Sequence, residues 1–280
     1  MKSLLLKLFC ISFIVLLSFK SNTQEFQGKA YYYSKSKMEL GKWGARLSEA
    51  QKKDVAARLK NRLEKTYVLS FDKEASVFKE EDKLDAVSGA TDSWGANFSR
   101  GYQYKNVKEN ALVQSQEFYG KKFLVKDKLQ TIEWKMGKET KQIGQYTCFK
   151  ATASIPTNDL NWYNFSWADI SQPEPKKNAD GTTEEVKEPE IKMTEIEAWY
   201  TPQVPVSHGP AEYWGLPGLI LEVSAGNTIM LCSKIVINSG EQVKIEAPDK
   251  GKEINKADYQ NTIREKMLEM RNNRGRRRRG

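Results

Sequence analysis

The sequence holds few of the side chains that carry out nucleophilic or metal-assisted catalysis. Its single histidine, His208, follows Ser207 directly, and adjacent residues have the wrong geometry for the hydroxyl–base pair of a catalytic triad. Cys148 and Cys232 are distant from each other in sequence, so with one histidine they do not make the clustered ligand set of a structural zinc site. We therefore expect no metal, no cofactor and no catalytic residue of these classes.

Carboxylates are the one route to catalysis that the residue types leave open. Four of them lie in the same part of the chain: Glu195, Glu197, Glu212 and Glu222. Two carboxylates that meet in space can act as acid and base, whereas solvated side chains at strand edges are the simpler interpretation. An envelope enzyme with a carboxylate site is therefore the alternative function, and a non-catalytic role is favoured.

Binding is the favoured function because aromatic side chains are concentrated around a proline-rich segment. Such side chains can line an apolar concavity that holds a lipid, another apolar ligand or a partner protein. They can equally fill the core of the domain. Trp134 could line the same site, and the candidates for ligand or partner contact are Trp199, Tyr200, His208, Tyr213 and Trp214.

The proline-rich segment leads into the stretch Gly215-Leu216-Pro217-Gly218-Leu219-Ile220. Pro217 followed by Gly218 predicts a type II turn, with a positive φ at the second glycine, and Gly215 allows close backbone approach. A strand follows rather than a helix, so these glycines do not form a phosphate loop. Gly226-Asn227 then predicts a type II′ hairpin that pairs Val223 with Met230 and places Cys232 on the apolar side.

Short strands separated by turn residues predict the rest of the fold. Strands are expected at 26–34, 66–71, 75–79, 100–106, 111–118, 122–126, 132–136, 142–153, 194–200, 219–223, 229–237 and 243–247. Ser48 predicts the start of an amphipathic helix that ends near Lys65 and packs on the sheet, and 256–270 predicts a second helix. The fold class is α+β: a mainly antiparallel curved β-sheet, open or a partial barrel, with one helix in the N-terminal half and one at the C-terminus.

The N-terminus indicates export. Residues 1–23 have two early lysines, an apolar run and small residues before Gln24, as a signal peptide does; an uncleaved anchor is the alternative, although the run is short for a membrane span. The protein is then periplasmic, attached to the outer membrane, or secreted. In such compartments Cys148 and Cys232 can form a disulfide, or they can be buried free thiols.

Charge is concentrated at the two ends of the chain. Taking three lysines of the predicted signal and six terminal arginines from the net charge of +9 leaves residues 24–270 without net charge. The domain therefore gives no electrostatic reason to expect specific nucleic acid binding. The arginines predict contact with an anionic surface, or a solvated terminus without a partner: Arg271, Arg274, Arg276, Arg277, Arg278 and Arg279.

The hexapeptide at 215–220, together with Ala198-Trp199-Tyr200-Thr201 and the run 132–151, resembles the GLPGLI family of secreted envelope proteins from Gram-negative bacteria. The resemblance implies export and a β-rich domain, and it supplies no catalytic residues. We expect one domain over 24–250 with a mobile insertion at 171–190, a terminal helix within 251–270 and a disordered tail at 271–280.

Overall fold

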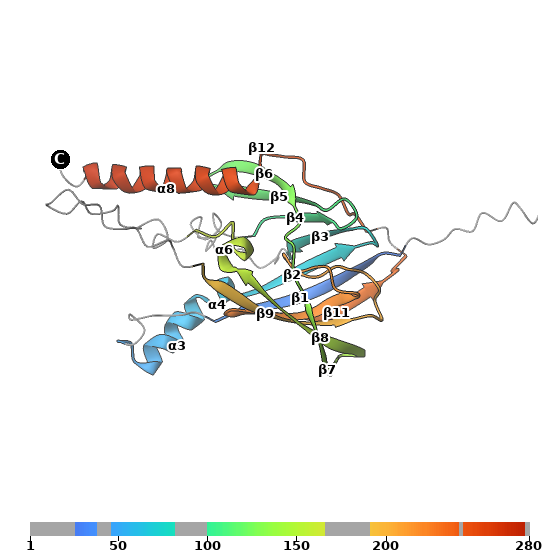
Figure 1. Cartoon of the computed structure of the whole chain (residues 1–280). Helices are drawn as coiled ribbons and strands as arrows, with labels where there is room; N and C mark the ends of the chain where they lie inside the picture. Colours follow the sequence, from blue (N-terminus) through green and yellow to red (C-terminus); the bar gives the residue numbers. More distant parts are fainter. Residues whose placement is uncertain (1–25, 38–45, 82–99, 166–190, 241–242, 278–280) are drawn as a thin grey trace, which may run out of the picture.

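The computed structural model of the protein describes residues 26–37, 46–81, 100–165, 191–240 and 243–277 (Figure 1). The predicted signal peptide at 1–23 and the predicted insertion at 171–190 lie outside these residues. No helix among the described residues is long and apolar enough to cross a membrane.

Twelve strands of the described chain form one curved, open sheet (Figure 1). They are β1 Gly28–Ser36, β2 Glu64–Phe71, β3 Ala75–Glu80, β4 Gln103–Asn106, β5 Ala111–Phe118, β6 Lys121–Lys128, β7 Lys135–Ile143, β8 Tyr146–Pro156, β9 Met193–Thr201, β10 Leu219–Ala225, β11 Thr228–Ile237 and β12 Lys252–Ile254. Their order across the sheet is β12-β6-β5-β4-β3-β2-β1-β11-β10-β9-β8-β7. Only β12 pairs in parallel, with β6, so the mainly antiparallel curved sheet of the predicted fold class is confirmed.

The two faces of the sheet differ in what covers them. Ala30 of β1, Leu69 of β2 and Phe78 of β3 lie opposite one another in register and have no exposed surface. We call the face that carries them the inner face, because the main hydrophobic core packs there. The opposite face, which we call the outer face, carries their sequence neighbours, since side chains alternate along a strand.

A second, smaller core lies where the C-terminal helix α8 (Lys256–Arg277) packs against β6. Tyr259, Ile263 and Met267 recur every four residues and are fully buried, which confirms the predicted apolar stripe. The side chain of Asn255 accepts a hydrogen bond from the Asp258 backbone N–H at 2.8 Å and so caps the helix N-terminus.

Several predicted elements end elsewhere in the structure. α8 continues to Arg277, so residues 271–277 are helical where a disordered tail was predicted. Residues 243–247 are not a strand, and β7 begins only at Lys135, so most of the predicted strand at 132–136 is irregular. Both predicted strands alternate apolar and polar residues, but alternation alone does not make a strand, because a strand also needs a neighbour to pair with.

The predicted N-terminal helix is also shorter and less buried than expected. Ser48 and Gln51 form the capping box of α3 (Glu49–Arg58), as a Ser N-cap predicts, but α3 buries none of its residues. The chain breaks at Leu59, and the four-residue helix α4 (Lys60–Leu63) is the part that contacts β1 and β2. Of the predicted helix, the end formed by α4 therefore contacts the sheet as expected, whereas α3 does not bury an apolar face there.

Candidate functional site

The turn at 215–218 positions the segment that crosses the inner face, and it differs from the predicted turn. The Gly218 N–H donates to the Leu216 carbonyl at 2.8 Å, so Pro217 is the centre of a three-residue γ-turn rather than part of a type II turn. A Cβ atom on Gly218 would lie 2.3 Å from the Thr201 carbonyl oxygen, whereas Gly215 has the positive φ of 91°. Gly218 also has the predicted positive φ, of 157°, but the close backbone approach that was predicted for Gly215 occurs at Gly218 instead.

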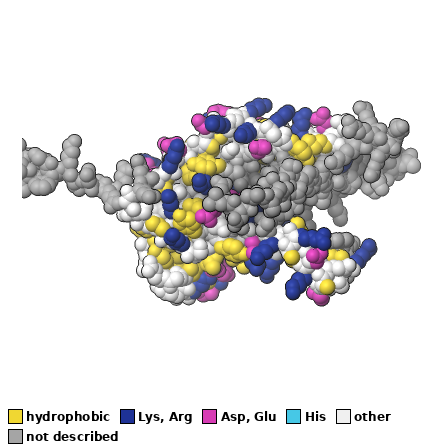
Figure 2. Space-filling model, turned by 180° about the vertical axis from the view of Figure 1, so that it is seen from behind, with side chains coloured by type: hydrophobic (Ala, Val, Ile, Leu, Met, Phe, Trp, Pro, Cys, Tyr) yellow, Lys and Arg dark blue, Asp and Glu magenta, His cyan; other side chains and the backbone are white. Residues whose placement is uncertain are grey.

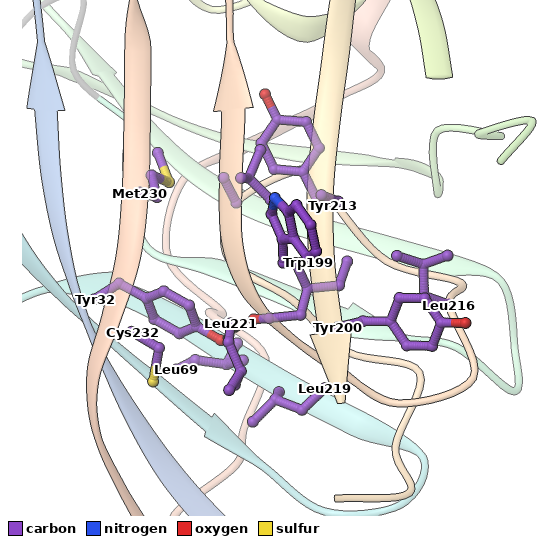
Figure 3. Close-up of a cluster of buried hydrophobic side chains, with 14 of the residues drawn as sticks. Tyr32, Leu69, Trp199, Tyr200, Tyr213, Leu216, Leu219, Leu221, Met230 and Cys232 are labelled. Carbon is purple, nitrogen blue, oxygen red and sulfur yellow. Dashed lines mark hydrogen bonds between the residues drawn. The ribbon is translucent and has the colours of Figure 1, made fainter. Parts of the chain in front are cut away.

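The hairpin that follows confirms the predicted register. Val223 pairs with Met230 and Ala225 with Thr228. Gly226 has φ 54°, and Asn227 is not among the residues with positive φ, which fits a type II′ turn. Figure 3 shows Cys232 beside Leu221 and Tyr32, on the apolar side where the register places it.

The residues predicted to contact a ligand lie mostly in the interior. Trp199, Tyr200 and Tyr213 are each less than a tenth exposed and belong to the main core (Figure 3). Trp214 is half-buried, and its indole Nε1 donates to the Gln130 carbonyl at 2.7 Å. These positions fit the alternative in which the aromatic side chains fill the core, and a binding role for these residues stays a prediction.

The two cysteines are buried free thiols in the structure, which is the second of the two alternatives, and no disulfide joins them. Burial raises the pKa of Cys148 to about 11 and that of Cys232 to about 12. Both thiols therefore stay protonated at neutral pH and behave as small apolar side chains.

The glutamates weighed as an acid–base pair have separate partners. Glu195 accepts from the Ser154 hydroxyl at 2.6 Å, and Glu222 forms an ion pair with Lys141 at 2.8 Å. The Trp199 indole N–H donates to Glu197 at 2.9 Å, and this hydrogen bond is the largest cause of the lowered pKa of Glu197. A lowered pKa keeps Glu197 ionised, which is the opposite of what a general acid requires.

A buried lysine holds the proline-rich segment against the inner face. Lys105 of β4 is 1% exposed, and its Nζ donates to the carbonyls of Gly209, Ala211 and Tyr213 at 2.9, 2.7 and 3.1 Å. Burial lowers the pKa of Lys105 to about 7, although the nearby Glu212 acts in the opposite direction. All three ammonium protons are thus used to fix one loop.

Three glutamine and glutamate side chains extend this polar cluster. Gln103 Nε2 donates to Glu212 at 2.8 Å and to the Gln114 side-chain oxygen at 3.0 Å, and all three residues are buried. Because a carboxylate only accepts, Glu212 fixes which end of the Gln103 amide faces it. The cluster joins β4, β5 and the loop before β10 into one unit.

His208 lies in the same loop and is fully buried. Its Nε2 is 3.1 Å from the Asp72 carbonyl oxygen, and since a carbonyl only accepts, Nε2 carries the proton and Nδ1 is an acceptor. Nδ1 has no hydrogen-bond partner among the described residues. Burial, helped by the charge of Lys105, lowers the pKa of His208 to about 3. The imidazole is therefore neutral, and its place is structural.

The outer face carries a groove of about 630 Å³ that the sequence analysis did not predict. Its floor is formed by Val68 and Ser70 of β2 and Val77 of β3, which pairs with Ser70. Tyr31 of β1, which pairs with Val68, and Tyr102 stand on either side of this floor. The sheet face is hollow here because short side chains lie between longer ones.

The segment 243–248, which we call the strap, forms one wall of the groove. The backbone N–H of Val243 donates to the Gln27 side-chain oxygen at 2.8 Å, and the Tyr102 hydroxyl donates to the Glu246 carbonyl at 2.9 Å. Lys244 and Glu246 of the strap form an ion pair at 3.0 Å. These bonds fasten a segment without sheet pairing to the outer face.

Lysines line the groove beside the apolar floor. Lys29 of β1 and Lys79 of β3 both border it, and neither has an ion-pair partner among the described residues. Figure 2 shows that hydrophobic and basic side chains also alternate on the surface seen from behind. The groove therefore combines apolar contact area with positive charge.

The comparisons with known proteins give a family without a known activity. Residues 134–222 match the model of a family described as "Protein of unknown function (Porph_ging)", and no curated protein matches the chain. Two solved structures of PNGF-II, in the C2 and P21 space groups, are 15% identical to the chain with TM-scores of 0.47 and 0.46. Each match covers 85% of this chain and about a third of the PNGF-II chain (32% and 33%). Over residues 134–222, which run to β10 and include the hexapeptide, the chain is thus similar to the GLPGLI-type family.

Proposed function

We propose that the protein is an exported, non-catalytic binding protein of the cell envelope, and that its ligand occupies the groove on the outer face. The observation that carries this proposal is the groove itself: its floor contains two valines, and the fastened strap forms one of its walls. Ligand pockets have volumes of about 300–1,000 Å³, and the groove, at about 630 Å³, lies within this range, with apolar and charged side chains both in its lining.

The outer face of the sheet supports this role because few contacts, those of the strap and the tyrosines, shape the groove. Val68 and Val77 are less than a tenth exposed although they lie on the outer face, so the strap and the tyrosines shield them. A ligand that lies on them adds to this apolar contact without displacing the inner core.

The proposal is tested by native mass spectrometry of the protein purified from its own envelope. We expect a bound small molecule in the wild type. Replacing Ser70 by Trp fills the groove floor and should abolish the bound species, whereas Thr66→Trp, on the same strand and face but outside the groove lining, should retain it.

Thermal unfolding of both variants shows whether each is folded. Loss of the ligand in a folded Ser70→Trp variant alone supports the groove. An empty wild type, or equal retention of the ligand by both variants, contradicts this site.

The terminal arginines and the location of the protein belong to the same proposal. The helix α8 extends past the sheet (Figure 1) and carries the backbone as far as Arg277, while Arg278 and Arg279 lie outside the described residues. We infer that this basic end holds the protein near an anionic envelope surface, since clustered arginines favour such surfaces. Fractionation of cells that express the chain with and without residues 271–280 tests this placement.

A further inference from the structure

We propose that the groove selects a small anion with an apolar body, whose carboxylate or phosphate lies between Lys29 and Lys79 and whose apolar chain lies over Val68 and Val77. This inference rests on the proposed function, because it names the class of ligand for the same groove. Its support comes from the charge balance of the groove and from the register that places the lysines.

The register puts the two lysines on opposite sides of β2. Lys29 of β1 lies opposite Ser70, and Lys79 of β3 lies opposite Val68. Their side chains therefore approach the floor from both sides. A single charged group above Ser70 is within reach of both long side chains, while Val68, two residues earlier on β2, and Val77, opposite Ser70 on β3, line the groove beneath the apolar chain.

The charges of the groove do not cancel. Five charged residues line it: three lysines and two glutamates. Lys244 and Glu246 neutralise each other at 3.0 Å, which leaves Lys29 and Lys79 against Glu81. Two ammonium groups beside an apolar floor, without partners in the described chain, attract an anion and repel a cation.

The floor selects for apolar material as well as charge. Val68 and Val77 are the apolar residues of the floor, and Ser70 is its one polar side chain. Each methylene that such a surface removes from water strengthens binding by about fourfold. The tyrosines at the sides present apolar ring faces together with hydroxyl groups, which suits the junction between a charged head and an apolar chain.

The test uses three single-chain probes that share a ten-carbon tail: decanoate, decyl maltoside and decyltrimethylammonium. Each is titrated below its micelle concentration into the exported protein, and valine methyl NMR signals locate the site. We expect decanoate to bind most tightly and decyltrimethylammonium most weakly, with a preference of up to about fivefold for each lysine that pairs with the anion.

Two double variants that lose the same charge separate this inference from the proposed function. The double substitution K29Q/K79Q should remove the preference for decanoate and leave the affinity for decyl maltoside unchanged. The control K122Q/K128Q removes the same charge from β6, away from the groove, and should keep the preference.

Equal affinities for all three probes, or a preference that survives K29Q/K79Q, would overturn the anionic class while the binding function stands. If no probe perturbs Val68 or Val77 and the protein also purifies empty, both the class and the proposed function are refuted. Decyl phosphate in place of decanoate then distinguishes a phosphate from a carboxylate head when the expected result is obtained.

Discussion

Acid should destabilise this protein partly through one residue, His208. The unfolded chain binds a proton at an ordinary histidine pKa of 6.5, whereas burial keeps the folded imidazole neutral down to about pH 3. The folded pKa is lowered for a base, so this contribution to stability is complete above pH 6.5 and is lost as the pH falls towards 3. Each pH unit in that window removes about 1.4 kcal/mol of unfolding free energy.

The magnitude follows from the two pKa values. At pH 4.5, two units below the unfolded pKa, the loss from His208 relative to pH 7.5 is about 3 kcal/mol. The hydrogen bond to the Asp72 carbonyl acts in the opposite direction but does not outweigh this loss, because Nδ1 is buried without a partner in the described chain and the charge of Lys105 opposes protonation. The chain has no second histidine to confuse the result.

Urea unfolding at pH 7.5 and 4.5, followed by tryptophan fluorescence, measures this loss. His208→Gln keeps an amide that can donate to the Asp72 carbonyl but does not titrate. Carboxylates with lowered pKa values, such as Glu197, lose stability equally in both proteins. The variant should therefore lose about 3 kcal/mol less than the wild type between the two pH values. The same loss in both proteins would refute the assignment of a neutral, buried imidazole.

Two further substitutions, each with a control, test the turn at 215–218 and the loop that Lys105 holds. Gly218→Ala should lower stability by about 3 kcal/mol, because the new Cβ meets the Thr201 carbonyl. Gly226→Ala, at φ 54° with no atom nearer to its Cβ than Thr194 at 3.9 Å, should cost about 1 kcal/mol. Thermal unfolding compares the two variants, and equal losses would argue against close approach at Gly218. Lys105→Met leaves the carbonyls of three loop residues without their donor and should cost about 2 kcal/mol or more. The exposed Lys128→Met should change stability by less than about 0.5 kcal/mol, and a Lys105→Met variant as stable as this control in urea would contradict the clamp.

The sheet could be predicted from the sequence because its strands alternate or are short and bounded by turns. The hairpin at Gly226-Asn227 was predicted to the residue pair, since a two-residue turn fixes the register of the strands that it joins. The apolar stripe of α8 could also be predicted, because Tyr259, Ile263 and Met267 follow the helical period within a single element.

The polar cluster could not be predicted, because its cause lies in another part of the chain. Tyr102, just before β4, and Tyr104 within it look like the apolar side, yet Gln103 and Lys105 are the buried residues. The loop carbonyls at 209–213 need a donor there, and alternation along a strand contains no information about a loop about a hundred residues away.

The groove was missed for a related reason. Its floor comes from β2 and β3, its sides from β1 and Tyr102, and its wall from the strap at 243–248. A hint was present, because Tyr67 to Phe71 is apolar at nearly every position, which is typical of a strand covered on both faces. What covers the outer face could be learned only from the contacts of the strap.

The central place of β1 has a consequence for how the chain folds. β1 joins two halves of the sheet: β2 to β6 follow it on one side, and β11 to β7 lie on the other. The pairing of β1 with β11 links residues about two hundred positions apart, so the two halves cannot be joined until nearly all of the chain is available. Contacts this distant in sequence close slowly. We expect refolding in which each half forms early as a meander and the β1–β11 seam closes last.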